Sequence, residues 1–170
     1  AALGGRAVAC GSLRRRRRWV GDVDLVLDGV PPDEALRMLG DLGLRVVSPA
    51  GDGPRTGLVT PAGIPVDVWS PGGPTGLGPC VLHATGSGVH NALMRRWART
   101  VHGLSATWRG VHDPTTGVRL DDGTEDGIRR LLCWPLLEPW EREVDPLRPP
   151  AWLRPYLDEM DRLEAVPVGT

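Results

Sequence analysis

Three aspartates are the residues in this sequence that could most directly do chemistry. Asp22 and Asp24 are two positions apart in the apolar segment 22–27, so in a strand their side chains project from the same face. Asp67 lies in a second apolar segment, 64–69. Carboxylate oxygens are ligands that Mg²⁺ prefers, together with substrate phosphates. Three such groups on neighbouring strands would hold two Mg²⁺ ions, with Mn²⁺ as a substitute, for in-line phosphoryl transfer.

A second group of residues could bind the phosphates themselves. Gly11 and Ser12 follow the apolar segment 7–10; a glycine there lets backbone N–H groups approach phosphate oxygens, and Ser12 adds a hydroxyl donor. Arg15 would neutralise the charge on a leaving pyrophosphate. Each feature alone has a plainer interpretation: an Asp-x-Asp pair is common, Gly-Ser usually marks a turn, and five consecutive arginines usually form a solvated loop. Their combination with a third strand aspartate favours nucleotidyl transfer.

The motifs and their order resemble a known family. Segments Gly11–Arg15 and Gly21–Asp24 match the GSxRR and GDVD patterns of the family X, polymerase-beta-like DNA polymerases, which belong to the nucleotidyltransferase superfamily. Thr85–Ser87, with Asn91 and Arg95 at fixed offsets, is similar to the family motif built on YFTGS. Farther along, the sequence has counterparts of the family patterns TGxR, TEEDIF and PPEERE. The likeness covers most of residues 7–145 in the right order.

The resemblance implies a role for each matching residue. Asp22 and Asp24 would bind both metal ions, and Asp67 would bind the catalytic ion and activate the primer 3′-hydroxyl. Thr85–Ser87 would form the turn under the sugar, and Asn91 would reach the minor-groove edge of the incoming base. The implied nucleotide-binding residues are Gly11, Ser12, Arg15, Gly21, Thr85, Gly86, Ser87 and Asn91, and the implied DNA-binding residues are Arg95, Arg96 and Arg99.

The sequence also departs from the family pattern. The aromatic pair before Thr-Gly-Ser is His83-Ala84 here, which argues against strict rejection of ribonucleotides. The position two before the third aspartate, often Arg in the family, is Pro65. We see no counterpart of the family's N-terminal lyase and helical domains. Because the chain has no lysine to form a Schiff base, we do not expect lyase activity.

Hydrophobic periodicity predicts short strands and helices along the chain, and the resemblance implies an α/β (α+β) architecture: a nucleotidyltransferase palm with a mixed sheet and helices, followed by a small α+β thumb lobe. We expect the palm at 1–70, a Gly- and Pro-rich linker or hinge at 71–79, the thumb lobe at 80–145, and a Pro-rich tail at 146–170 in which 151–165 fit a helix. Thr124 should cap a helix. Within the thumb we expect the core anchors Trp97, Trp108 and Trp134, and the solvated helix face Arg129 and Arg130.

Composition narrows the class of protein. The 170 residues are 41% hydrophobic and 24% charged, and the net charge is -1. Because the protein as a whole does not attract a polyanion, a surface that binds nucleic acid must concentrate its positive charge locally. No apolar run approaches the roughly 20 residues of a membrane span. The cysteines Cys10, Cys80 and Cys133 are far apart, which favours a reducing compartment. We expect a cytoplasmic monomer, prokaryotic or viral, without a membrane partner.

The function predicted from these features is template-directed addition of dNTPs to a primer 3′-end on DNA, in short-gap repair. Two alternatives stay open. One is a template-independent nucleotidyltransferase that acts on RNA, protein or small-molecule acceptors. The other is a non-catalytic palm that serves as a DNA-binding module.

Overall fold

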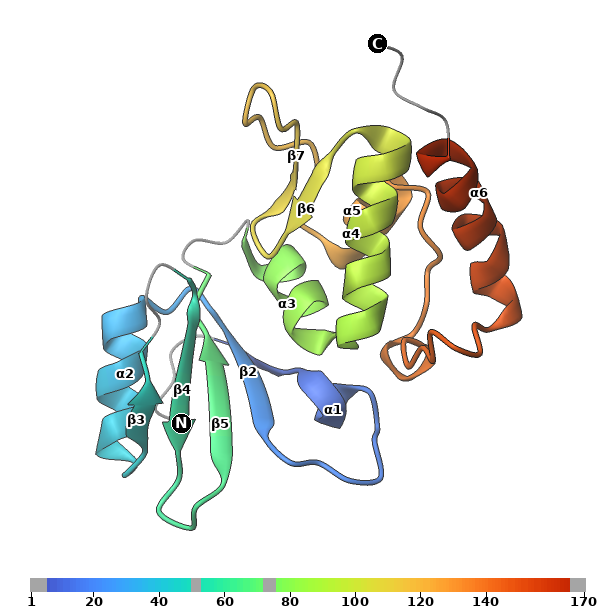
Figure 1. Cartoon of the computed structure of the whole chain (residues 1–170). Helices are drawn as coiled ribbons and strands as arrows, with labels where there is room; N and C mark the ends of the chain where they lie inside the picture. Colours follow the sequence, from blue (N-terminus) through green and yellow to red (C-terminus); the bar gives the residue numbers. More distant parts are fainter. Residues whose placement is uncertain (1–5, 50–52, 72–75, 166–170) are drawn as a thin grey trace.

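Alternating apolar residues build the first lobe, the palm, around a five-stranded sheet (Figure 1). The computed structural model describes residues 6–49, 53–71 and 76–165. The sheet order is β1-β2-β5-β4-β3, and the β2–β5 pair is parallel while the other neighbours are antiparallel. The strands are β1 (Arg6–Ala9), β2 (Val23–Asp28), β3 (Arg45–Ser48), β4 (Arg55–Val59) and β5 (Pro65–Trp69). The predicted mixed sheet is confirmed.

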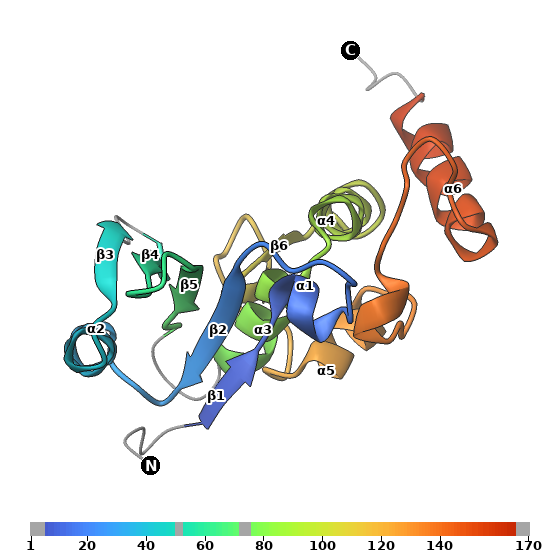
Figure 2. The ribbon, with the colours of Figure 1, turned by 90° about the horizontal axis from the view of Figure 1, so that it is seen from below.

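Two helices cover opposite faces of this sheet. Neighbouring side chains of a strand point to opposite faces, so Leu27 of β2 packs with α2 (Pro32–Asp41) and Val26 packs with α3 (Leu77–Thr85). Val26 and Leu27 are both almost fully buried. The short helix α1 (Gly11–Arg14) follows β1 directly, and the loop after it returns to β2 (Figure 2).

The predicted C-terminal boundary of the linker, residue 79, is wrong. Residues 72–75 lie outside the described part of the chain, but 77–79 form the first turn of α3. Pro79 is compatible with this position, where its missing N–H has no helical acceptor. A Cβ at Gly78 would overlap the backbone of Gly123 and Thr124, so glycine is required there by close packing. Gly78 is therefore explained by the close contact of α3 with the backbone at residues 123–124.

The second lobe, the thumb, packs helices around two tryptophans. It comprises α3, α4 (Gly88–His102), the hairpin β6 (Ser105–Thr107) and β7 (Gly110–His112), and α5 (Glu125–Leu131). Trp97 and Trp134 are core residues, 8% and 2% exposed, as predicted. None of the described helices has the length and apolar character needed to cross a bilayer.

Three predictions for side chains of the thumb can be compared with the structure. Thr124 caps α5 by accepting a hydrogen bond from the backbone N–H of Gly127, as predicted. The solvated position predicted for Arg129 is wrong, because this side chain is buried and donates to Asp126 and to the carbonyl of Leu137. Trp108 is half-buried and lies outside the main thumb cluster.

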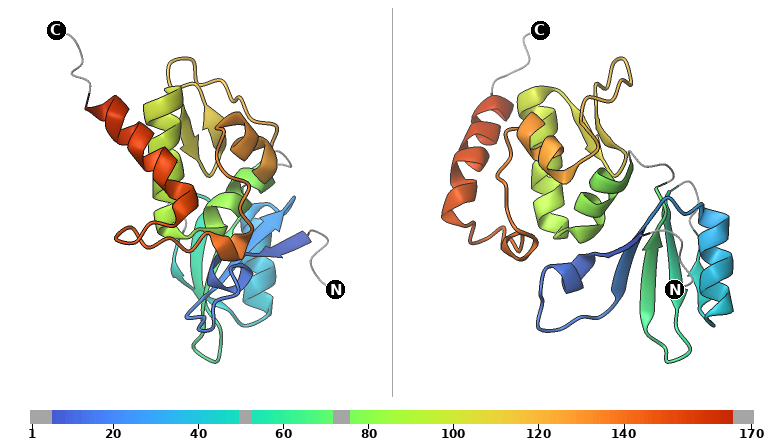
Figure 3. Two further views of the ribbon diagram at one scale, coloured as in Figure 1. Left: turned by 90° about the vertical axis from the view of Figure 1, so that its right-hand side faces the viewer. Right: turned by 180° about the vertical axis from the view of Figure 1, so that it is seen from behind.

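The tail packs back on the thumb. After the 3₁₀ turns η2 (Pro139–Glu141) and η3 (Ala151–Leu153), helix α6 (Arg154–Glu164) lies beside α4, as both views of Figure 3 show. Leu153 and Met160 are fully buried in the thumb core. The predicted tail helix is present, and its apolar face completes the core.

We expect Leu153→Ala to lower the free energy of unfolding by about 3 kcal/mol, because it leaves a cavity among buried side chains. Urea unfolding would measure this. Leu147→Ala is the matched control, since Leu147 is 90% exposed and its loss should cost less than about 0.5 kcal/mol. Equal effects of the two substitutions would show that the tail is not part of the cooperative core.

Candidate active site

Two of the three aspartates face each other across the parallel strands. Asp24 of β2 and Asp67 of β5 are register partners. Two residues farther along these strands, Val26 and Trp69 belong to the cluster that packs on α3, so the carboxylates project from the same face of the sheet. Asp22 precedes β2 by one residue and is exposed. The strands thus bring the predicted metal-binding residues to one end of the palm.

Gly11 allows the backbone after β1 to approach this end of β2. The backbone N–H of Cys10 donates to the carbonyl of Asp24 at 2.8 Å. Gly11 follows with a φ of +56°, a left-handed conformation that favours glycine. A Cβ on Gly11 would overlap the carboxylate of Asp24. The Gly-Ser step therefore lies directly against the aspartates.

The electrostatics of this end of the sheet favour a bound cation. The pKa of Asp24 is raised from 3.8 to about 6, first by burial of the carboxyl and next by the negative charges of Asp22 and Asp67. The Trp69 side chain and the positive charge of Arg15 oppose the rise without cancelling it. Because repulsion between carboxylates is the kind of energy that a shared cation relieves, the donor set fits Mg²⁺.

Asp67 has a partner that the sequence analysis missed. Arg55 Nη1 donates to Asp67 Oδ2 at 2.7 Å. Arg55 lies on β4, where Gly57 is the register partner of Asp67, so the contact depends on strand pairing. At the position where the family often has Arg, this chain has Pro65, and the guanidinium comes from the neighbouring strand.

Within residues 6–49, 53–71 and 76–165, no three His, Cys, Asp or Glu side chains gather closely enough to hold a metal ion. The structure thus brings the aspartates together without arranging them as a finished metal site. Their metal-binding role stays a prediction.

The two predicted triphosphate contacts differ in their surroundings. Ser12 Oγ is buried and, among the described residues, has no hydrogen-bond partner. A buried hydroxyl without a partner is costly, and a ligand oxygen would remove that cost. Arg15 is instead bound to the thumb: its Nε donates to Glu143 Oε1 at 2.6 Å and its Nη1 donates to the carbonyl of Thr85. Gly21 lies in the exposed loop before Asp22.

The segment Thr85–Ser87 forms the turn between α3 and α4. Ser87 caps α4, since its Oγ accepts from the backbone N–H of His90 at 3.3 Å. Thr85 is fully buried, and its Oγ1 accepts from Arg14 Nη1 at 2.7 Å. The turn predicted from the motif exists, and its side chains stabilise the helices and the contact with the palm.

Asn91 is also occupied within the protein. Its Nδ2 donates to the carbonyl of His83 at 2.7 Å, and the side chain is 5% exposed. Asn91 and Arg95 both line a small cavity beside His83 and Ile128. The predicted contact of Asn91 with a base would therefore require its amide to turn toward this cavity.

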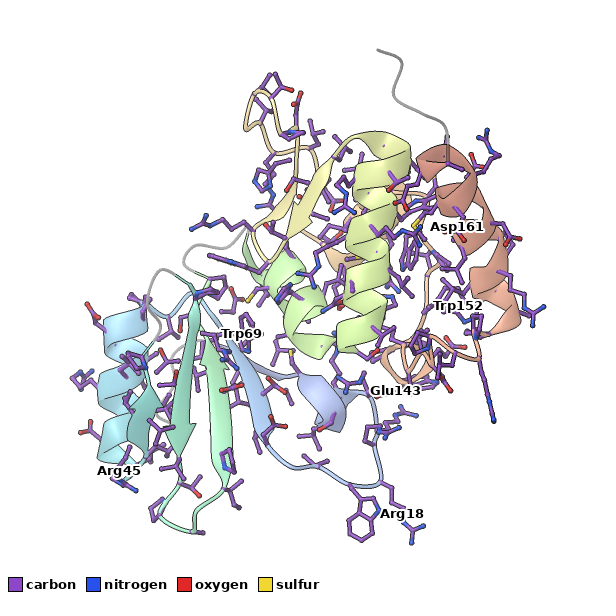
Figure 4. All side chains as sticks on the ribbon, in the orientation of Figure 1. Arg18, Arg45, Trp69, Glu143, Trp152 and Asp161 are labelled. Carbon is purple, nitrogen blue, oxygen red and sulfur yellow. The ribbon has the colours of Figure 1, made fainter. Side chains whose placement is uncertain are left out.

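The three arginines predicted to bind DNA lie on α4 but do not share an environment. Arg95 and Arg99 are exposed and line an open groove of about 410 Å³ next to β6. Arg96 points toward α6, where it binds Asp161 and Glu164, each at 2.6 Å. Asp161 is labelled on α6 in Figure 4. Arg95 and Arg99 are thus the better placed of the three, and the DNA-binding role of all three stays a prediction.

The likeness to known proteins is found in the thumb. Residues 80–143 match the family model described as the DNA polymerase beta thumb. This match supports a relationship of the chain to the polymerase-beta-like, family X polymerases. A search of curated proteins found no match. Because the match is to a polymerase thumb, it indicates that the second lobe is a DNA-binding, polymerase-like module.

A partly buried ionic cluster joins the palm to this polymerase-beta-type thumb. Glu125 of α5 accepts from Arg14 Nη1 and Nη2 at 3.0 and 2.6 Å, and from Arg142 Nη1 at 3.1 Å. Arg142 is 1% exposed, and its backbone carbonyl accepts from Ser87 Oγ at 2.7 Å. Arg14, Glu125 and Arg142 lie within the motifs that carry the resemblance, but the sequence alone indicates no role for them because their partners are distant in the chain.

We expect Asp24→Asn to stabilise the protein above about pH 6 when no divalent ion is present. A folded-state pKa above the unfolded value means that the folded protein binds the extra proton, so wild-type stability falls as the pH rises from about 4 to 6. The amide does not titrate. Because the Asp24 side chain is partly exposed, water screens the repulsion, and the gain in the free energy of unfolding is about 1–2 kcal/mol.

Urea unfolding of wild type and Asp24→Asn across this pH range checks the prediction. Asp28→Asn, at the far end of the same strand, is the control and should show no such gain. A difference between wild type and Asp24→Asn that is constant with pH would contradict the prediction.

Proposed function

We propose that the chain is a template-directed DNA polymerase that adds dNTPs to a primer 3′-end, releases pyrophosphate, and fills short gaps in DNA repair. The observation that carries the proposal is the pairing of Asp24 with Asp67 beside Ser12. A polymerase-beta-type thumb then follows in the same chain. Phosphate-binding and metal-binding groups together with a DNA-binding lobe support nucleotidyl transfer on DNA.

In this proposal the three aspartates hold two Mg²⁺ ions. When bound, such ions supply Lewis-acid stabilisation of the phosphoryl oxygens and of the attacking 3′-hydroxyl. Arg55 donates to Asp67 Oδ2, which fixes the carboxylate that would help to hold the ions. Ser12 Oγ donates to a phosphate oxygen of the incoming nucleotide, and Arg15 offsets the charge of the leaving group. Arg95 and Arg99 bind backbone phosphates of the template strand.

The thumb match favours this function over a template-independent nucleotidyltransferase, because it indicates DNA as a partner. The Arg55–Asp67 pair, in which a guanidinium takes up one oxygen of a proposed metal ligand, is the observation that favours a non-catalytic DNA-binding module. Activity on DNA separates the three functions.

The test is primer extension by the wild-type protein on a duplex with a one-nucleotide gap, with Mg²⁺ and each of the four template bases. We expect addition of the complementary nucleotide in each case. The same nucleotide added whatever the template base would indicate a template-independent transferase. No addition on a duplex that the protein binds would indicate a DNA-binding module.

A further inference from the structure

Five consecutive arginines, residues 14–18, run from the last residue of α1 into the loop that leads to β2, and the first three of them contact the thumb. Arg14 binds Glu125 and Arg15 binds Glu143. The guanidinium of Arg16 lies 3.8 Å from the ring centre of Trp140. The base of the loop is therefore fixed in place.

The next residues are presented to solvent. Trp19 is 81% exposed and Val20 is 42% exposed. The Arg17 side chain is 56% exposed, and 3.8 Å separates its Nε from Glu143 Oε1. Arg18 has no carboxylate partner among the described residues, and its guanidinium lies 5.6 Å from the Trp19 ring centre. Figure 4 shows Arg18 at the end of the loop, away from Glu143 and the thumb.

This combination of side chains indicates a ligand. Tryptophan side chains are highly buried on average, so an exposed tryptophan indicates a surface that can bind a ligand. Cations beside an exposed aromatic ring are the means by which proteins bind single-stranded nucleic acid, with bases stacked on the ring and phosphates on the cations. The loop also lies between Ser12 and Asp22, the residues proposed to bind the phosphates and the metal ions.

We propose that Arg17, Arg18 and Trp19 form a contact site for single-stranded DNA beside the active site. Trp19 stacks on one base, and the two guanidinium groups bind the flanking phosphates. Two cations beside a stacking ring span more than one nucleotide, which favours a strand over a free nucleoside triphosphate. The position beside a primer end rests on the proposed function, but the binding itself requires no catalysis.

The test is fluorescence anisotropy of a labelled oligothymidylate, without Mg²⁺ or nucleotide, with wild type and Trp19→Ala. We expect Trp19→Ala to weaken binding about 5- to 150-fold, the range for loss of one stacked base. The double variant Arg17→Ala/Arg18→Ala should reduce the slope of log K against log salt by about 1.4, because each phosphate contact on a single strand contributes about 0.7.

The matched control for charge is Arg37→Ala/Arg45→Ala, which removes two exposed arginines from α2 and β3. Arg45 lies on the far side of the palm from Arg18 (Figure 4), so this variant should keep the wild-type slope. Thermal unfolding should be unchanged by Trp19→Ala, because the ring makes no buried contact.

Equal affinity of wild type and Trp19→Ala for the oligonucleotide would overturn the inference. So would weaker binding of thymidine triphosphate by Trp19→Ala with oligonucleotide binding unchanged, because the site would then belong to the free nucleotide. If Trp19→Ala loses oligonucleotide binding while the wild type fails to fill a gap, the inference stands and the proposed function fails.

Discussion

Asp67→Asn is expected to lower the rate of nucleotide addition on a gapped duplex by about 10³-fold or more. The substitution keeps the shape of the side chain but removes the charge that faces Asp24 across the parallel strands. Loss of a metal ligand removes several kcal/mol of transition-state stabilisation, and each 1.36 kcal/mol is tenfold in rate. Single-turnover primer extension in saturating Mg²⁺ and dNTP measures the effect.

Two variants separate the role of the charge from that of the fold. Asp28→Asn alters a carboxylate on the same strand as Asp24 and should retain the wild-type rate. Arg55→Ala removes the partner of Asp67, and because the Arg55 side chain is 50% exposed the pair should contribute only about 0–1 kcal/mol to stability. An Asp67→Asn protein that extends primers at the wild-type rate would exclude Asp67 from the reaction.

The second large effect is expected from Glu125→Gln, which should lower the free energy of unfolding by about 3–5 kcal/mol at neutral pH. The substitution leaves two arginines, Arg14 and Arg142, without their carboxylate, and Arg142 is 1% exposed. Breaking a buried ion pair by removing one partner leaves an uncompensated buried charge. Urea unfolding gives the magnitude.

The pH dependence of this effect gives a second readout. Burial by itself would raise the pKa of Glu125, but the hydrogen bond from Arg14 and the positive charges of Arg142 and Arg14 outweigh it, so the pKa lies below 4.5. A lowered folded-state pKa contributes stability that is present above pH 4.5 and lost as the pH falls below it. The difference between wild type and Glu125→Gln should therefore shrink in acid.

Glu159→Gln is the matched control, because Glu159 binds Arg162 on the surface of α6 at 2.6 Å. Water screens an exposed pair of this kind, so it contributes little to stability. If Glu125→Gln is no more destabilising than this control, the ionic cluster does not hold the thumb on the palm.

That Asp24 and Asp67 lie on strands could be predicted from the sequence because it depends on local rules, whereas their pairing across β2 and β5 depends on how the strands assemble. A strand alternates its side chains with a period of two, and each aspartate lies in a short apolar run that is typical of a strand. The capping of α5 by Thr124 follows from equally local chemistry. Such features need no knowledge of which elements touch.

The features that the sequence did not reveal depend on contacts between distant segments. Gly78 and Pro79 are residue types typical of a linker. The close approach of the Gly123 backbone to α3 explains why a glycine is needed at this helical position. The sequence predicts a solvated position for Arg129 and a DNA contact for Arg96, yet Arg129 is buried and Arg96 binds acidic residues of α6. An arginine does not show in sequence whether its partner is water, a carboxylate or a phosphate.

The arginine loop has a consequence for how the two lobes depend on each other. Arg14 and Arg15 hold the thumb, and the same short stretch of backbone leads to Asp22. In the proposed polymerase, a thumb held open by a mismatched base pair would break both ion pairs and release the chain that leads to Asp22, a proposed metal ligand. Discrimination against errors would then take place before the chemical step, through a mechanical link between base-pair shape and the end of the palm that carries the aspartates.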